Sequence, residues 1–432
     1  MKKFLTAIVL TGFISLAAGL NITYASEVDA LIQKLIDKGV INASEAQEIR
    51  TETNEQITAR DKQKEEDYKK LAKDNMPDWV KNIKLKGDLR LRYQNKFDKA
   101  TNDLSKDTNI GRIRMRLGLE AKINDKLMAG IGIATGSGDP RSTNISFGGY
   151  NTKKTVVLDY GYAKYSPFKW LNLVGGKMLL GDTLWEPTDL IWDTDITPEG
   201  AIFQFNKDLG PKTNIFFNTG ALIVDTDTST DSNAPMAYIV QPGATYKFND
   251  NLSLKGAFSF QAFENVRGHV SSTYSGASNS GNTTAGTSSY TYDYKMINPA
   301  LELSIKEPFK AFGLDIEALK LQGEYVNNVD VSSGQGASGF SCGFKLGNEK
   351  IGKWGDWQVK YVYAMLGRDA VLDVLPDSDR YGGKTGIRSH EIEVQFGLGK
   401  NTFLGVDVYR SWRTYGARAP ETLAQIDWNM KF

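Results

Sequence analysis

Two groups of basic residues and one acidic stretch hold most of the residues that could do chemistry in this sequence. The basic residues share one parity within each of two neighbouring stretches, and they are Lys84, Lys86, Arg90, Arg92, Arg112, Arg114 and Arg116. Residues 181–199 carry six acids and no base, namely Asp182, Glu186, Asp189, Asp193, Asp195 and Glu199. Charges of opposite sign attract and orient ions rather than break bonds, provided that the fold brings the stretches together.

The sequence offers few groups for catalysis or for metal binding. Its one cysteine, Cys342, can form neither an internal disulfide nor a thiolate metal site. Of its two histidines, His269 begins a long loop and His390 shares its parity with apolar neighbours, so no base is paired with a nucleophile. The acidic run that begins at Asp225 lacks the glycine and the glutamate of a calcium loop. We therefore predict no enzyme activity, no cofactor and no metal site.

The overall charge excludes a further class of function. Among 432 residues, 52 lysines and arginines nearly balance 51 aspartates and glutamates. A chain without a net basic field has no general attraction for nucleic acid, so we expect no nucleic-acid partner.

The first 25 residues are typical of a secretory signal peptide. Lys2 and Lys3 precede an apolar run, and small residues end it before Ser26. No later stretch reaches the 18 or more apolar residues that a transmembrane helix requires. The sequence therefore predicts an exported protein without a helical membrane span.

Residues 26–76 have the pattern of a short helical segment. Leu31, Ile32, Leu35 and Ile36 recur at helical spacing, and Gly39 offers a stop. Ser44 with Gln47 predicts a capping box for a second, strongly charged helix, and Pro77 ends it. This spacing predicts helices over 26–76, followed by a different fold over 77–432.

From Ile83 onward, the hydrophobic period changes from 3.6 to 2. Apolar and polar side chains alternate along the rest of the chain, which is the pattern of strands with one apolar and one polar face. Sixteen such segments are predicted, near 83–93, 110–123, 126–136, 155–166, 170–180, 200–207, 212–225, 236–248, 251–264, 295–306, 314–327, 339–347, 356–367, 386–399, 402–413 and 421–432. The segment 314–327 changes parity near Ala318, which predicts a bulge.

The connections between these segments give an independent test. Starting after the second segment, every other connection is short, as at Asn124-Asp125 and Lys400-Asn401, whereas most of the intervening ones are long. Short turns on one side and long loops on the other are typical of outer-membrane barrels. We therefore predict an all-β membrane barrel of about 16 antiparallel transmembrane strands, preceded by a short periplasmic helical segment.

Three stretches carry a resemblance to a known family. They are 35–46 in the helical segment, Pro77 to Tyr93 at the start of the barrel, and the alternating last strand that ends at Phe432. On these the chain resembles the outer-membrane porins of Gram-negative bacteria, in particular the putative-porin family with a helical segment before the barrel. The resemblance implies location in the outer membrane, a channel that is often trimeric, and recognition of the last strand by the barrel-assembly machinery.

A barrel of sixteen strands is too wide for its side chains to fill, so it leaves an aqueous channel. We expect the seven basic residues named above to form one wall of that channel. Trp185, Leu190, Ile191 and Trp192 are unusual for a loop in solvent, so we expect residues 181–199 to fold inward. The six acids of this loop would then face the basic wall across a constriction. The sequence predicts a porin for passive diffusion of ions and small hydrophilic solutes.

Two other functions remain open at this level. The basic wall could make the channel selective for anions or for one substrate, and the helical segment 26–76 could serve as a structural tether that contacts the envelope. The expected partners are outer-membrane lipids, two further copies in a homotrimer, and the barrel-assembly machinery. The serine- and threonine-rich stretch 271–290 is typical of a flexible external loop, for which a receptor or adhesin role also stays open.

Overall fold

The chain divides into two compact units, 1–81 and 82–432, and each is described by itself. The structure, a computed structural model, describes residues 32–49, 51–52, 60, 63, 82–98, 108–226, 234–269, 281–285, 289–313, 316–332, 334, 336–416 and 420–432. The predicted signal peptide 1–25, Pro77, and residues 271–280 and 286–288 of the serine- and threonine-rich stretch 271–290 lie outside the described residues. Among those described, no helix is long and apolar enough to cross a membrane.

In the described part of the first unit, residues 32–37, 43–49, 51–52, 60 and 63 are helical. Gly39 ends the first of these stretches at a φ of 67°, and the Val40 N–H donates to the Leu35 carbonyl at 3.0 Å. A left-handed residue followed by this backbone bond is the usual helix C-cap, so the predicted stop at Gly39 is confirmed.

The capping box of the second helix differs from the prediction. Asn42 Oδ1 accepts the Glu45 N–H at 2.9 Å, and Glu45 Oε2 accepts the Asn42 N–H at 2.9 Å. Asn42 and Glu45 therefore cap this helix, and the predicted pair Ser44 and Gln47 was wrong. Asparagine satisfies a free N–H group at a helix start as well as serine does, so the helix begins two residues earlier than expected.

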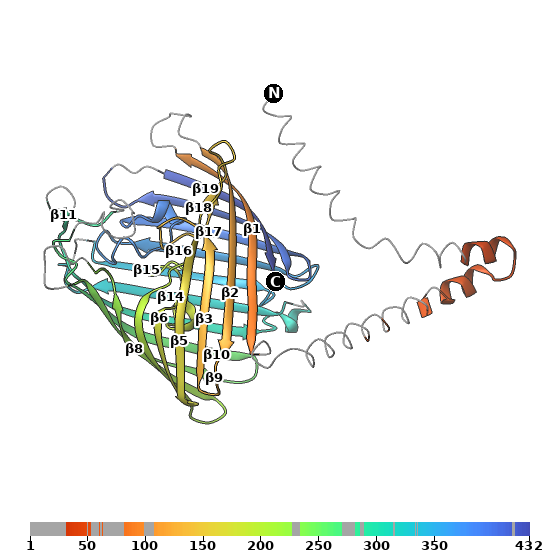
Figure 1. The fold of residues 1–432 in the computed structure, drawn as a ribbon, viewed down its shortest axis with the longest axis horizontal. Helices are drawn as coiled ribbons and strands as arrows, with labels where there is room; N and C mark the ends of the chain where they lie inside the picture. The colour runs from red at the N-terminus through yellow and green to blue at the C-terminus, as the bar shows by residue number, and fades with distance from the viewer. Residues whose placement is uncertain are drawn as a thin grey trace. The chain divides into compact units, whose positions relative to one another are not determined.

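Sixteen long antiparallel strands make up the described part of the second unit (Figure 1). They are β1 (Ile83–Asp98), β2 (Thr108–Lys122), β3 (Leu127–Thr135), β5 (Val156–Phe168), β6 (Leu171–Lys177), β7 (Glu199–Asp208), β8 (Thr213–Ile223), β9 (Met236–Lys247), β10 (Leu252–Glu264), β13 (Tyr294–Lys306), β14 (Ala318–Asn328), β15 (Ser338–Gly347), β16 (Trp357–Leu366), β17 (Ile387–Gly399), β18 (Thr402–Arg413) and β19 (Pro420–Lys431). Three two-residue strands lie in loops: β4 (Ile145–Ser146), β11 (Thr284–Ala285) and β12 (Ser289–Tyr290). Three 3₁₀ turns also lie in connections: η2 (Leu180–Asp182), η4 (Lys310–Phe312) and η5 (Arg380–Gly383).

The sheet closes between its first and last strands. β1 pairs with β2 on one side and with β19 on the other, with Asp88 opposite Lys431. At the chain end, the Gly87 N–H donates to the Phe432 carbonyl at 2.8 Å, and the Phe432 N–H donates to the Gly87 carbonyl at 3.0 Å. A closed sheet has no free edge, which is the condition for a β-structure to lie in a membrane.

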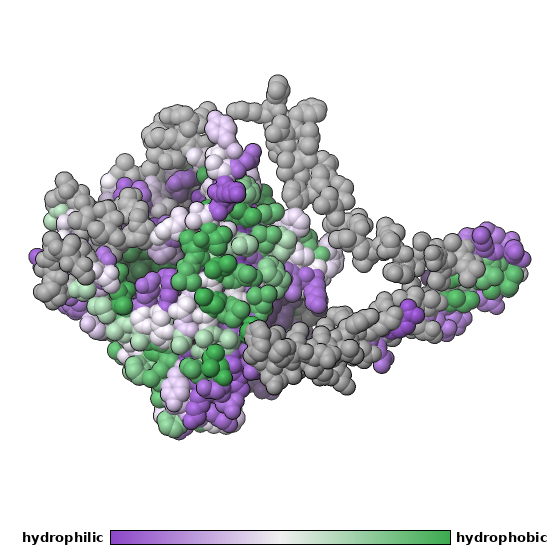
Figure 2. Space-filling model, viewed as in Figure 1, coloured by the Kyte–Doolittle hydropathy of each residue, from purple (hydrophilic) through white to green (hydrophobic). Residues whose placement is uncertain are grey.

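The strands present an apolar outer face and a largely polar inner face. Large apolar side chains such as Ile131, Phe258 and Ile392 are exposed on the outside. Their neighbours in sequence, such as Ser259 and Glu391, are buried on the inside. Figure 2 shows apolar side chains gathered over the strands that face the viewer. This alternation is that of a barrel with lipid outside and a polar interior.

The predicted strands are confirmed, with one correction of detail. Each of the sixteen predicted segments overlaps one long strand, and the short and long connections alternate as expected. The bulge predicted near Ala318 was wrong, because β14 begins at that residue and pairs with β13 in one unbroken register. The parity change marks the end of a connection that contains η4. Register shifts occur elsewhere, between Gly132 and Ile133 and between Gly397 and Gly399.

Glycines on β2 and β3 make room for one aromatic side chain, which yields a test of the packing. A Cβ at Gly132 would lie 2.1 Å from Tyr160 Cε1, and the Tyr160 side chain is buried. We expect Gly132→Ala to lower the free energy of unfolding by about 1–3 kcal/mol through overpacking. Urea unfolding of the refolded barrel, followed by tryptophan fluorescence, measures this change.

Gly161→Ala is the matched control, because no atom lies within 4 Å of a Cβ at Gly161 on the adjacent β5. Equal unfolding midpoints for the two alanine variants would contradict the assignment of Gly132 as a space for the tyrosine ring.

Candidate functional site

The loop between β6 and β7, residues 178–198, packs against inward-facing side chains of distant strands. The Trp185 N–H donates to Gln241 Oε1 of β9 at 2.9 Å, and Trp192 Nε1 donates to Gln261 Oε1 of β10 at 2.9 Å. Thr188 Oγ1 donates to the Glu324 carboxylate of β14. A loop that starts at β6 can reach all three strands only from within the barrel. We call residues 178–198 the first inner loop.

Apolar side chains explain why this loop leaves the solvent. Leu190, Ile191 and Trp192 are at most 3% exposed. They belong to a cluster that includes Met178, Phe263 and Tyr294 inside the barrel. Burial of each large apolar side chain contributes about 1.5–3 kcal/mol, which favours the inward course of the loop.

A second loop, residues 367–386 between β16 and β17, is hydrogen-bonded to the first inner loop. The Asp193 N–H donates to the Leu375 carbonyl at 2.7 Å, and the Ser378 N–H donates to Asp193 Oδ2 at 2.8 Å. Val371 and Leu372 of this loop are fully buried. We call residues 367–386 the second inner loop, and its part in the site was not predicted from the sequence.

Arg380 holds the two inner loops to the barrel wall. Its Nη2 lies 2.9 Å from Asp189 Oδ1 of the first inner loop and 3.0 Å from Glu391 Oε2 of β17. Glu391 also pairs with Lys360 of β16, whose ammonium lies 3.2 Å from Glu393. Two clusters of three carboxylates lie close enough to hold a metal ion, one of Asp189, Asp377 and Glu391 and the other of Glu391, Glu393 and Asp407. Arg380 contacts all three members of the first cluster, and Lys360 pairs with Glu391 and Glu393 of the second.

The basic residues of β2 are neutralised by acids on both sides. Arg114 Nε and Arg116 Nε donate to the Asp88 carboxylate of β1 at 3.0 and 2.7 Å. Arg116 Nη1 also donates to Asp195 Oδ1 of the first inner loop at 3.2 Å. The acidic loop therefore meets the basic strands at Arg116.

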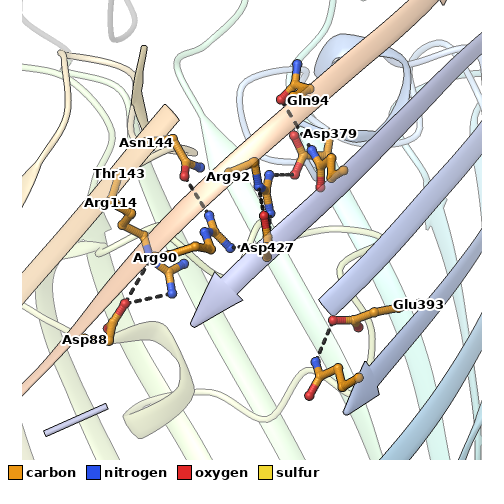
Figure 3. Close-up of polar contacts among 12 residues, drawn as sticks. Asp88, Arg90, Arg92, Gln94, Arg114, Thr143, Asn144, Asp379, Glu393 and Asp427 are labelled. Atoms are coloured by element: carbon orange, nitrogen blue, oxygen red, sulfur yellow. Dashed lines mark hydrogen bonds and ion pairs between the residues drawn. The ribbon is translucent and has the colours of Figure 1, made fainter. Parts of the chain in front are cut away.

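Of the arginines of β1, Arg92 turns toward β19, and Arg90 lies between Asn144 and Asp427 (Figure 3). Arg92 forms a bidentate pair with Asp427 of β19, with both bonds at 2.7 Å, and its Nη1 lies 3.0 Å from Asp379 Oδ2 of the second inner loop. Arg90 Nη2 donates to Asn144 Oδ1 at 2.8 Å, and its Nη1 lies 3.6 Å from Asp427 Oδ2. Bidentate guanidinium pairs fix orientation as well as charge, so these side chains are held in place.

A cavity of about 330 Å³ lies between these groups. Mostly charged and polar residues line it, from β1, β2, β16–β19, the connection between β3 and β4, and both inner loops: Asp88, Arg90, Arg92, Arg114, Arg116, Arg141, Asn144, Asp189, Asp193, Thr194, Asp195, Lys360, Asp377, Ser378, Asp379, Glu393, Gln395, Phe403, Asp407, Tyr409, Asp427, Asn429 and Lys431. Such a lining holds water and ions rather than an apolar ligand.

The structure brings together seven of the thirteen residues singled out from the sequence. Those that line the cavity are Arg90, Arg92, Arg114, Arg116, Asp189, Asp193 and Asp195. The other six lie elsewhere: Lys84, Lys86, Arg112, Asp182, Glu186 and Glu199. Lys86 pairs with Glu120, Glu199 pairs with Lys177 at 3.1 Å, and Glu186 is turned toward Gln261 at 3.4 Å.

Sequence reasoning missed the acids that neutralise the arginines of β1, namely Asp427 of the neighbouring β19 and Asp379 of the second inner loop. Asp427 alternates with Ile426 and Trp428 on the last strand, which is the signal that places it inward. The second inner loop carries the apolar run 370–375, a signal of the same kind as the tryptophans that identified the first. Both signals were present in the sequence, but their partners depend on closure of the barrel.

Burial changes the acidity of loop carboxyls at this site. Burial, and then the neighbouring Asp195 carboxylate, raise the pKa of Asp193 to about 8. Burial also raises the pKa of Asp377 well above its usual value, with the charge of Asp189 adding to the effect. These two carboxyls bind a proton more readily than ordinary aspartates do.

A closed sheet of sixteen antiparallel strands around a charged interior defines an outer-membrane channel of the porin class. The chain belongs to the family described as "Putative porin", whose profile matches residues 38–109, 98–297 and 289–432. Both family and fold are those of channels rather than of enzymes. The protein is therefore a channel for passive diffusion in the outer membrane of Gram-negative bacteria.

Solved structures are similar to this chain at low sequence identity, and one of them, with a TM-score above 0.5, shares its fold. The Pseudomonas putida OprB structure is 10% identical with a TM-score of 0.53, and the match covers 82% of this chain and 95% of that one. The outer membrane channel DcaP of Acinetobacter baumannii is 14% identical with a TM-score of 0.44, covering 81% and 97%. A comparison with curated proteins finds no match.

Removal of Arg380 tests whether it holds the inner loops. In Arg380→Met, the buried Glu391 and the half-buried Asp189 lose their shared cation, so we expect a loss of about 3–5 kcal/mol in the free energy of unfolding. Urea unfolding in detergent measures the loss, and limited proteolysis within 367–386 reports whether this loop is released.

Arg267→Met is the control, because Arg267 is exposed and its loss should change stability by no more than about 0.5 kcal/mol. If Arg380→Met unfolds at the same urea concentration as this control, Arg380 does not hold the loops.

Proposed function

We propose that the two inner loops narrow the channel to a charged constriction, through which ions and small hydrophilic solutes diffuse. The observation that carries this proposal is the contact of Asp195 with Arg116 at 3.2 Å, where the first inner loop reaches the basic strand β2 inside the barrel. Groups of both signs then lie around the path of a solute, which is how porin-like constrictions act on ions.

The charges in the cavity lining favour a general channel over the anion-selective alternative. Nine carboxylates and seven cations line it, and most of the arginines are paired with an acid. A cation that is already paired attracts a passing anion less strongly than a free one does. Asp193 and Asp377 bind a proton more readily than ordinary aspartates do, so the charged carboxylates do not clearly outnumber the cations. We therefore propose weak selectivity with no marked preference for either sign of ion.

We also propose how the chain reaches the outer membrane and is assembled there. Residues 1–25 direct export and are removed, residues 26–76 remain in the periplasm, and the barrel-assembly machinery recognises the strand that ends at Phe432. The exposed apolar side chains around the barrel support contact with lipid and with further copies in a homotrimer. The mass of the purified protein in detergent tests the trimer directly.

Loss of Arg114 tests the charged constriction. In Arg114→Ala, one of the two arginines that neutralise Asp88 is removed, so the constriction gains net negative charge. We expect the cation-to-anion permeability ratio to rise roughly twofold. The reversal potential of single channels in a planar bilayer under a salt gradient measures this ratio.

Lys212→Ala serves as the control, because Lys212 lies in an exposed turn far from the lining. A reversal potential for Arg114→Ala that equals those of this control and of the unchanged protein would refute the constriction.

The raised pKa of Asp193 predicts a pH dependence. Asp193 is protonated below about pH 8 and charged above it, so the constriction becomes more negative as the pH rises through 8. We expect cation permeability to be higher at pH 9.5 than at pH 6.5. Because the pKa in the folded state lies above that in the unfolded state, ionisation also weakens the packing of the loop at high pH.

Asp193→Asn should lose the part of this change that has its midpoint near pH 8, while keeping the uncharged contacts of the loop. An unaltered midpoint in the asparagine variant would assign the titration to another group.

A further inference from the structure

A cluster of basic and aromatic side chains lies on the outer face of the barrel, across β16, β17 and β18. Arg388 and Arg410 lie over the ring of Trp412, with guanidinium carbons 5.5 and 5.3 Å from its centroid. His390 lies between Trp412 and Tyr363, at 5.8 and 4.9 Å between ring centroids. We call Arg388 and Arg410 the outer arginine pair.

The alternation of the strands places this pair outside. The residues on either side of Arg388, Ile387 and Ser389, are at most 1% exposed, and so is Ser411 beside Arg410. Ile392 and Val406 share the parity of the outer arginine pair on their strands and are 50% and 44% exposed. The pair thus belongs to the surface that faces the membrane.

The strand register gives the level of the pair along the barrel. Ile392 lies opposite Val408, the next outward pair is His390 with Arg410, and the one after it is Arg388 with Trp412. The chain then enters the long loops. The outer arginine pair therefore lies next to the last aliphatic pair, Ile392 and Val408, on the side of the long loops. At this end of the strands, lipid headgroups meet the barrel.

The outer arginine pair has no carboxylate partner among the described residues. The contact of Arg388 is the Trp412 ring, and Arg410 Nη1 donates to the Thr422 hydroxyl. Lys295, an outward cation at the same end of β13, differs because it lies 3.5 Å from Glu264 and 3.3 Å from Asp330. An aromatic ring orients a guanidinium but leaves its positive charge uncompensated.

We propose that the outer arginine pair binds the phosphate of a phosphorylated lipid in the leaflet that adjoins the long loops. Guanidinium groups match phosphate oxygens in charge and in bidentate geometry. The Trp412 ring contacts both guanidinium groups, which lie at two successive outward positions, and the apolar residues next along the strands, Ile392 and Val408, would accompany the acyl chains. This site lies on the outside of the barrel and does not depend on the proposed constriction.

The test compares lipid retention by the full chain in a nonionic detergent, using native mass spectrometry with added dioleoylphosphatidic acid or dioleoylphosphatidylcholine. We expect the protein to retain phosphatidic acid in preference to phosphatidylcholine. Arg388→Gln and Arg410→Gln should each weaken this retention roughly fivefold. Lys295→Gln, the matched control, should retain phosphatidic acid as the unchanged protein does.

Further measurements separate this proposal from its alternatives. Single-channel conductance should stay the same in all variants, since the pair lies outside the channel. Retention by the double variant equal to that of the unchanged protein would overturn the proposal. So would displacement of the lipid by an equal concentration of inorganic phosphate, which would indicate a site for free phosphate. A loss of oligomer mass in the double variant would overturn it too, by assigning the pair to a contact between copies.

Folding of each variant is checked by the shift of its band on heating in gel electrophoresis. Arg388 is exposed and its replacement leaves the ladder bonds of β17 unchanged, so Arg388→Gln alone suffices if Arg410→Gln does not fold.

Discussion

The backbone of this protein must pair all its N–H and C=O groups without help from solvent, because hydrocarbon offers no hydrogen-bond partner. The sheet meets this requirement by closing on itself, with β1 between β2 and β19. Closure has a geometric result, which is an interior too wide for strand side chains to fill. The protein fills part of that space with its own loops, and the apolar cluster around Trp192 and Leu372 holds them there.

The same closure makes the charges of the site compatible with one another. Arginines on β1 and β2 would repel each other as direct neighbours, and Arg90 and Arg114 lie opposite in the register of these strands. Each of these arginines is paired with a different set of acids. These acids include Asp88 of β1, Asp427 of β19 and Asp195 of the first inner loop. Only a closed sheet brings β19 beside β1, so the neutralisation of Arg92 depends on the last strand.

Much of the fold follows from the sequence, because apolar and polar side chains have to alternate along a strand that has lipid on one face and water on the other. Each predicted segment became a strand, and the parity of Arg114 correctly placed its side chain inward. The predictions that failed concern either a choice between neighbouring residues or a contact between residues far apart in the sequence. Asn42 took the cap expected of Ser44, since both residue types satisfy the same N–H groups. Asp427 was missed because its partner, Arg92, is 335 residues away and meets it only through the closing register. The second inner loop was missed because an apolar run in a loop does not show whether the loop folds into the barrel or lies outside it. That depends on the first inner loop, against which it packs.

The link between the two inner loops has a mechanical consequence. Asp193 accepts a backbone hydrogen bond from Ser378 and donates one to Leu375, while Arg380 ties the same pair of loops to β17. Neither loop can leave its place without breaking bonds to the other, so they form one cooperative strap rather than two independent flaps. If such a strap narrows the channel, its thermal fluctuation should switch the current between two discrete levels, whereas separate loops would give a graded series of intermediate levels.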